Sequence, residues 1–160
     1  MREAGPDDLD VVGALRLAFL ADHRGVAPSD LPDGFGARTR AYLDRQQRAG
    51  TIGSWLAEDD AGRAVGVVTL LVLDMPPRPG DDRTGEGYVL NMYVDPAARR
   101  QGIGRSLFAA LLAGAEERDL RRLFLHATPD GRPLYEQAGF APNEDWLELR
   151  ARPGRRGILT

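Results

Sequence analysis

Arginines surround two closely spaced glycines in the stretch from Val94 to Leu107. Gly102 and Gly104 allow the backbone to curl so that successive N–H groups point to one spot. A helix that begins there adds the positive end of its dipole, and this combination binds anions. The flanking side chains that could donate charge-assisted hydrogen bonds to phosphate oxygens are Arg99, Arg100 and Arg105. These residue types therefore predict a phosphate-binding turn.

Other phosphate-binding patterns fit this stretch poorly. A dinucleotide-binding fingerprint would need a third glycine where Leu107 stands, and the turn is longer than that fold uses. A Walker A loop requires lysine, but all 21 basic side chains of the chain are arginines. A tight strand-to-helix connection that binds nothing is the other interpretation of the Gly-x-Gly spacing alone.

The composition excludes several further kinds of chemistry. The 160 residues include no cysteine, so neither a disulfide framework nor a thiol nucleophile can form. The absence of lysine excludes a Schiff base and a lysine general base. The two histidines, His23 and His126, are far apart in the sequence and do not predict a metal site. We therefore expect a protein that works without a metal ion.

Charge and hydropathy indicate which partners to expect. A net charge of −3 argues against the phosphate backbone of nucleic acid as the main partner. No stretch approaches the roughly 20 apolar residues of a membrane span, and the first residues lack the apolar core of a secretory signal. We expect a cytoplasmic protein with neither a nucleic-acid nor a membrane partner, and exposed edge strands could support a homodimer.

The length corresponds to a single domain, expected over residues 1–150 and followed by a basic tail at 151–160. Hairpin-linked strands come first and a strand-helix-strand unit follows, which predicts an α/β (α+β) fold with helices covering a mixed sheet. The loop at 76–85 is either a mobile or substrate-facing element or a plain solvated connection. The expected helices are 7–20, 37–48, 104–118 and 131–138, and the expected strands are 54–58, 64–73, 88–94, 121–127 and 146–150, with a further short strand near 1–4.

Two motifs resemble the GNAT superfamily of acyl-CoA-dependent N-acyltransferases. The signature of that superfamily, which follows a buried strand, is Arg/Gln-x-x-Gly-x-Gly/Ala, and Arg99, Gly102 and Gly104 occupy its defined positions. Downstream, residues 134–140 are similar to the superfamily's Leu-Tyr-Glu-x-x-Gly-Phe segment. The motifs stand in the expected order over residues 86–141, and the resemblance is weaker before residue 54.

The resemblance implies a mostly antiparallel central sheet in which a splayed central strand pair forms a cleft for acetyl-CoA. A bulge around Asn91 and Met92 would free a backbone N–H for the thioester carbonyl, so Met92 is the expected oxyanion donor. A buried Asn91 could instead serve only to satisfy the broken strand ladder. The implied acetyl-CoA-binding residues are Met92, Tyr93 and Val94 for the pantetheine arm, and Arg100, Gln101, Gly102, Ile103, Gly104 and Arg105 for the pyrophosphate, together with Arg99 and Tyr135.

The expected acceptor is a primary amine of a small molecule or peptide. Because the chain has no cysteine, no cysteinyl acyl-enzyme can form, and direct transfer in a ternary complex is the simpler hypothesis. Tyr135 occupies the superfamily's tyrosine position and is the expected general acid for the leaving thiolate. Glu86, on the strand expected to carry the bulge, is a candidate base, and a surface carboxylate at a strand end is its other interpretation. His126 is expected to be a hydrogen-bonded core residue rather than a catalyst. A CoA-binding module without catalysis is the alternative function.

Overall fold

The computed structural model describes residues 1–145 and 147. The chain divides into two units, Met1–His126 and Ala127–Thr160, and the single domain expected over 1–150 stays a prediction. The expected strand at 146–150, apart from Leu147, and the basic tail at 151–160 lie outside the described residues. Across the described part of the chain, every helix is too short or too polar to cross a bilayer.

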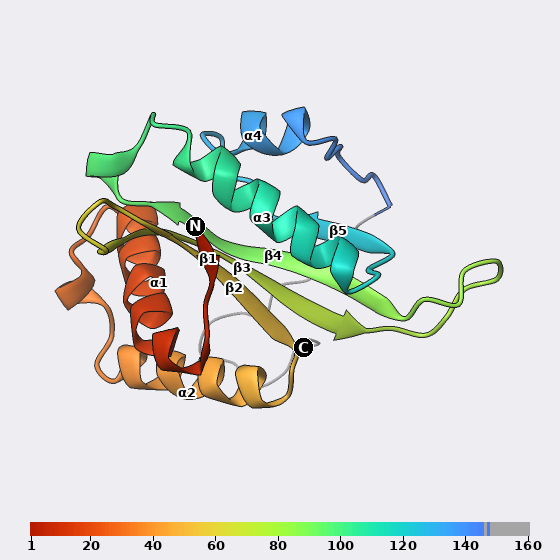
Figure 1. Cartoon of the computed structure of the whole chain (residues 1–160), viewed down its shortest axis with the longest axis horizontal. Coiled ribbons are helices and arrows are strands. Elements are labelled where there is room, and N and C mark those ends of the chain that lie inside the picture. Colours follow the sequence, from red (N-terminus) through yellow and green to blue (C-terminus); the bar gives the residue numbers. More distant parts are fainter. Residues whose placement is uncertain (146, 148–160) are drawn as a thin grey trace, which may run out of the picture. The chain divides into compact units, whose positions relative to one another are not determined.

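The first unit places helices against one sheet. The strands are β1 (Arg2–Glu3), β2 (Ile52–Glu58), β3 (Ala64–Asp74), β4 (Gly85–Val94) and β5 (Arg122–Leu125), and the helices are α1 (Leu9–Arg24), α2 (Phe35–Arg48) and α3 (Ile103–Glu117), with short 3-10 turns at Pro6–Asp8, Pro28–Asp30 and Pro96–Ala98 (Figure 1). The five strands follow the order β1-β2-β3-β4-β5. Neighbours are antiparallel from β1 to β4, and β4 and β5 are parallel. This topology confirms the mixed, mostly antiparallel sheet, with α3 in the crossover that parallel strands require.

The second unit contains α4 (Arg132–Gln137), close to the helix expected at 131–138. Pro133 stands in its first turn, where the missing N–H costs nothing. Gly139, with a φ of 93°, follows its end, a conformation that glycine adopts readily. A proline in the first turn and a glycine after the last are therefore sufficient to predict this helix from the sequence.

The boundaries differ from the expected ones where tertiary contacts extend or shorten an element. α1 continues to Arg24 rather than ending at residue 20, because Ala21 is buried and Gly25 caps the helix in a left-handed conformation. β4 begins at Gly85 rather than at 88, because its pairing with β3 continues as far as Asp74. The strand expected over 121–127 is shorter and ends at Leu125.

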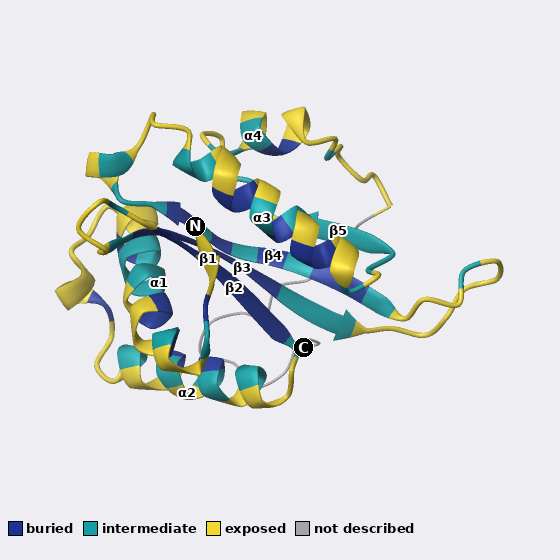
Figure 2. Ribbon diagram, in the orientation of Figure 1, coloured by how far each residue is buried: buried dark blue, intermediate teal, exposed yellow. Residues whose placement is uncertain are grey.

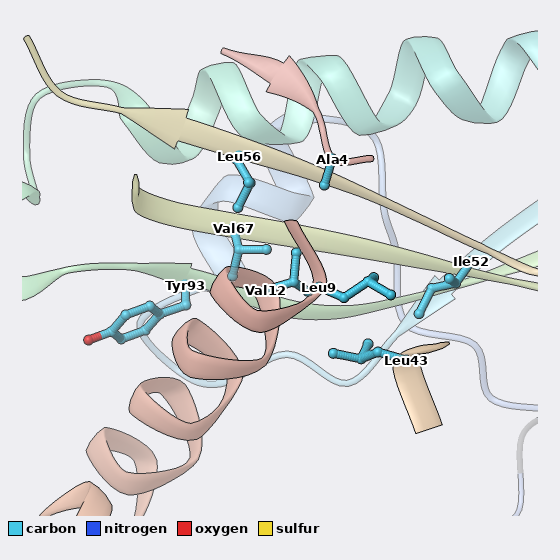
Figure 3. Close-up of a cluster of buried hydrophobic side chains, with 8 residues drawn as sticks. All are labelled: Ala4, Leu9, Val12, Leu43, Ile52, Leu56, Val67 and Tyr93. Atoms are coloured by element: carbon cyan, nitrogen blue, oxygen red, sulfur yellow. The ribbon is translucent and has the colours of Figure 1, made fainter. Parts of the chain in front are cut away.

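Helices pack on both faces of the sheet, as two neighbouring residues of β3 show. A Cβ added to Gly66 would lie 3.0 Å from Leu107 Cδ1, so this side of β3 faces α3. Val67 belongs instead to a buried cluster with Leu9 and Val12 of α1 (Figure 3). Because successive strand residues point to opposite faces, α1 and α3 lie on opposite sides of the sheet. Figure 2 shows the strands between them as largely buried.

The β3–β4 connection extends beyond the sheet as a long hairpin loop (Figure 1). Arg121, which directly precedes β5, donates from Nη1 to the carbonyl oxygens of Pro76 at 2.9 Å and Arg83 at 3.0 Å. Arg78 and Asp81 form a backbone bridge near the tip. The base of this loop is therefore anchored to the start of β5.

Candidate functional site

A bulge interrupts β4 at the position expected for it. The register of β4 on β3 shifts between Val67 and Thr69, so that Asn91 and Met92 together oppose Val68. Asn91 has a φ of 55°, in the left-handed region that asparagine tolerates better than most residues. The extra residue breaks the regular hydrogen-bond ladder beside Met92.

Hydrogen bonds across three strands hold the Asn91 side chain. Its Oδ1 accepts a hydrogen bond from Arg16 Nη1 of α1, and its Nδ2 donates to Thr69 Oγ1 at 3.4 Å. Thr69 Oγ1 in turn lies 2.9 Å from Ser54 Oγ. Asn91, Thr69 and Ser54 are all buried. The amide therefore does more than satisfy a broken ladder, because it connects the first helix to the bulge.

The parallel pair β4–β5 separates before β4 ends. Pairing begins with Glu86 beside Arg122 and stops with Val89 beside Leu125, whereas β4 continues to Val94. Among the described residues, the bulge and the end of β4 thus lie beyond the last β5 partner. This arrangement is the splayed central pair expected from the sequence.

The turn that precedes α3 presents a series of backbone N–H groups. Arg100 and Gly102 have left-handed conformations, with φ of 67° and 82°, and α3 starts directly afterwards at Ile103. Within residues 1–145, no group accepts a hydrogen bond from the N–H groups of residues 100–104. Consecutive N–H groups in such a turn form a concave nest, and the helix adds its positive end. The turn therefore fits a phosphate group.

The two glycines of the turn have different surroundings. A Cβ added to Gly102 would meet nothing within 4 Å, so this residue borders open space. A Cβ on Gly104 would lie 3.4 Å from Met92 Cε and 3.9 Å from Val94 Cγ2. Gly104 therefore allows the first turn of α3 to pack against the end of β4, which brings the N–H groups of the turn next to the bulge.

Arg99, the first residue of the glycine motif, has two partners within the protein. Its Nε donates to the Val94 carbonyl at 2.9 Å, and its Nη2 donates to the Asp22 carboxylate at 2.6 Å. Arg99 therefore ties the last turn of α1 to the end of β4. Arg100 and Arg105, like Arg99, are exposed, and they lie on the turn and on the first turn of α3.

Glu86 is buried at the start of β4, so its interpretation as a surface carboxylate is wrong. Its Oε1 accepts hydrogen bonds from Arg121 Nη2 at 2.7 Å and from Arg78 Nη2 at 3.3 Å, and its Oε2 accepts from Arg122 Nη2 at 2.5 Å. Burial raises the pKa of this carboxyl, but the hydrogen bonds from Arg122 and Arg121 outweigh burial and lower it overall. The group is a stable anion inside a cluster of guanidinium groups.

His126 follows β5 and is exposed, so the expectation of a core position is wrong. The expected hydrogen bond is present, since His126 Nδ1 lies 2.9 Å from the hydroxyl oxygen of Tyr88. The Tyr88 ring also lies 5.2 Å from the Phe124 ring, between centroids. Among the described residues, no cluster of three or more histidine and acidic side chains could hold a metal ion.

Tyr135 lies on α4, in the second unit, and is buried. A Cβ on Gly131 would lie 3.5 Å from its hydroxyl oxygen, and its ring centroid is 6.3 Å from that of Phe140. Burial raises the pKa of the Tyr135 phenol, so the hydroxyl keeps its proton at neutral pH. The protonation state that a general acid needs is thus present, and the acid role stays a prediction.

Sequence reasoning missed Arg16 and Thr69. Arg16 stands at helical spacing from Leu9 and Val12, both buried, so it interrupts an apolar helix face. Thr69 interrupts the apolar strand β3 in the same way. A polar residue on an otherwise apolar face is the signal that could have identified both.

Known proteins are similar to most of this chain. The family model described as the Acetyltransferase (GNAT) family matches residues 11–140. A mycothiol acetyltransferase of Salinispora tropica is 35% identical over 141 residues, which are 86% of this chain and 42% of that protein. A glucosamine 6-phosphate N-acetyltransferase of Trypanosoma brucei brucei is 25% identical over 121 residues, which are 76% of this chain and 80% of that protein. The chain thus spans less than half the length of the mycothiol acetyltransferase.

A solved structure agrees with these sequence matches. The crystal structure of a predicted acetyltransferase with acetyl-CoA from Clostridium acetobutylicum superposes with a TM-score of 0.81 at 28% identity, covering 93% of this chain and 94% of that chain. The family match extends over most of the chain and includes the bulged strand and the glycine turn. The chain therefore belongs to the acetyltransferase (GNAT) family.

Proposed function

We propose that the protein transfers the acetyl group of acetyl-CoA directly to a primary amine of a small-molecule acceptor. The observation that carries this proposal is the nest of N–H groups at 100–104, which have no acceptor among residues 1–145 and which pack through Gly104 against the bulged end of β4. A cofactor with a pyrophosphate and a thioester needs those two features side by side. The two named relatives support a small acceptor, because one is named for glucosamine 6-phosphate and the other for mycothiol.

The chain's own backbone would bind most of acetyl-CoA. The N–H groups from Arg100 to Arg105 would hold the pyrophosphate, and the splayed end of β4, residues 92–94, would bind the pantetheine arm. The Met92 N–H would donate to the thioester carbonyl oxygen, where negative charge develops during attack. Binding through backbone groups explains how a chain without lysine or cysteine can use this co-substrate.

In the proposed reaction the acceptor nitrogen attacks the thioester carbonyl carbon. The new C–N bond forms as the C–S bond breaks, the amine loses a proton and the CoA thiolate gains one. An acceptor amine with a pKa of about 10.4 arrives protonated, so its proton must first pass to water or a base. The Tyr135 hydroxyl would protonate the thiolate. Since the chain has no cysteine, no cysteinyl acyl-enzyme can precede the transfer.

Glu86 is a poor candidate for the base. Its carboxylate accepts hydrogen bonds from three arginines, and its pKa is lowered, so it takes up a proton less readily than a free glutamate. It also lies at the opposite end of β4 from Val94. We therefore propose a positioning role for Glu86, in which it anchors the start of β4 to β5.

Release of free CoA thiol, measured with acetyl-CoA and a panel of primary amines, tests this function. We expect amine-dependent thiol release and intersecting lines in double-reciprocal plots, as direct transfer in a ternary complex requires. Binding of acetyl-CoA without thiol release from any amine would instead favour the CoA-binding module. Parallel lines together with acetyl label retained on the protein would contradict direct transfer.

A further inference from the structure

Arg16 is a half-buried cation without a carboxylate partner among the described residues. It projects from α1, whose neighbouring residues Leu9 and Val12 are buried in the core. Its Nη1 donates to Asn91 Oδ1, and this amide oxygen carries no charge to balance the guanidinium. Other arginines of the described region, such as Arg40 and Arg118, have carboxylate partners.

Burying such a cation costs free energy of folding unless an opposite charge balances it. Taking a charged group out of water is unfavourable without a partner, and burial accordingly lowers the pKa of Arg16. Within residues 1–145 and 147, the one buried side-chain nitrogen or oxygen that lacks a hydrogen-bond partner is Arg122 Nε. The remaining N–H groups of Arg16 are therefore not fully buried among the described residues, and apart from the bond to Asn91 they have no acceptor there.

The same face of the sheet carries further positive charge. Glu86 and Tyr88 point to one face of β4, two residues apart, and Arg122 stands beside Glu86 in the parallel register. The single carboxylate of Glu86 is surrounded by Arg78, Arg121 and Arg122. This face of β4 therefore has an excess of guanidinium groups, although the chain as a whole has a net charge of −3.

We propose that Arg16 binds an anionic group of the acyl acceptor, a carboxylate or a phosphate, next to the β4 bulge. This inference rests on the proposed function and adds to it the chemical class of the acceptor. A guanidinium with several accessible donors suits both groups, because each presents two or more oxygens to a planar fork. The ligand's charge would then supply the balance that the described residues do not provide.

The position of Arg16 explains how binding an anion would serve the reaction. Arg16 is bonded to Asn91, which directly precedes Met92, the proposed donor to the thioester oxygen. An acceptor held by its anionic group at Arg16 would thus be anchored beside the reacting carbonyl. Such anchoring of one end of a substrate orients the other end for attack. Arg16 is therefore a specificity residue for the acceptor.

Paired amines that differ by one anionic group provide the test. The pairs are butylamine with 4-aminobutyrate, for the carboxylate, and glucosamine with glucosamine 6-phosphate, for the phosphate. Each is titrated by calorimetry onto wild-type protein saturated with CoA, which cannot react, and is also assayed for thiol release with acetyl-CoA. The variants are Arg16→Gln and Arg16→Lys, with Arg24→Gln as a control that removes an exposed arginine from the same helix.

We expect the anionic member of at least one pair to bind more tightly than its neutral counterpart. The pair that shows this difference tells whether the recognised group is a carboxylate or a phosphate. Arg16→Gln should raise the KM for that acceptor by about tenfold or more, leaving acetyl-CoA affinity unchanged. Arg16→Lys should restore part of the loss, and Arg24→Gln should behave as wild type. Equal binding of charged and neutral members in both pairs would overturn the inference. It would also be overturned if Arg16→Gln lowered the affinity for the charged and the neutral member of a pair by the same factor. Failure of the protein to bind CoA at all would instead overturn the proposed function.

Discussion

Asp22 of α1 and Arg99 of the glycine motif form a 2.6 Å ion pair between residues 77 positions apart in the sequence. The pair joins the last turn of the first helix to the segment that leads into the proposed pyrophosphate site. Both side chains are close to half exposed, so the pair should contribute little to stability. The pair matters instead for binding, because Asp22 places a negative charge next to Arg99, which is expected to face the CoA phosphates.

Replacement of Asp22 by asparagine should therefore tighten acetyl-CoA binding by a few fold. The substitution removes a negative charge that competes with the phosphates for the Arg99 guanidinium. Isothermal titration calorimetry measures the effect. Asp10→Asn is the matched control, because Asp10 lies on the same helix and pairs with Arg40, away from the turn. Weaker binding by Asp22→Asn would contradict the prediction and show that the ion pair organises the turn.

Glu86→Gln should destabilise the protein strongly, because it leaves the buried guanidinium of Arg121, and the half-buried one of Arg122, without their anion. Breaking a buried ion pair by removing one partner costs about 3–5 kcal/mol. Since the pKa of Glu86 is lowered in the folded state, its contribution is complete above the ordinary value of 4.5 and is lost as the pH falls through the folded value. Urea unfolding of wild type and variant should show a large difference near neutral pH that shrinks in acid.

The exposed pair of Asp81 with Arg83 supplies the control for this experiment, and Asp81→Asn should shift the urea midpoint only slightly. If Glu86→Gln unfolds at the same urea concentration as wild type but loses turnover, the positioning role is refuted and a catalytic role for this carboxylate returns.

Tyr135→Phe should reduce turnover by about 10²-fold, the lower end of what a general acid contributes, with little change in acetyl-CoA affinity. The substitution removes only the hydroxyl and keeps the buried ring that packs near Phe140. Steady-state kinetics and calorimetry on the same preparation separate the two effects. Normal turnover would show that another group, or water, protonates the leaving thiolate.

The features that follow from local sequence were predicted well. The glycine turn follows from Gly102 and Gly104, close together in the chain, and the mixed sheet follows from the order of the expected elements, whereas the bulge at Asn91 was expected from the resemblance to the GNAT superfamily. Tertiary partners were not predictable in this way. Arg16 meets Asn91 across 75 positions of sequence, and the buried Glu86 pairs with Arg121 and Arg122, which come 35 and 36 positions later. Periodicity reports which face of an element is apolar, not which polar group it will meet.

The most direct test concerns Gly102. Its φ of 82° and the open space beside it mean that a side chain there would project where a phosphate is proposed to bind. Gly50 has a similar φ of 68°, also without neighbours within 4 Å, and follows α2 away from the turn. Gly50→Val therefore reproduces the backbone strain of Gly102→Val, about 1–2 kcal/mol, without altering the proposed site.

Calorimetric titration of acetyl-CoA into these two variants and the wild type measures the affinity directly. The account predicts that wild type and Gly50→Val bind acetyl-CoA alike and that Gly102→Val shows no detectable binding while remaining folded by circular dichroism. An unchanged dissociation constant for folded Gly102→Val would contradict the assignment of this turn as the pyrophosphate site.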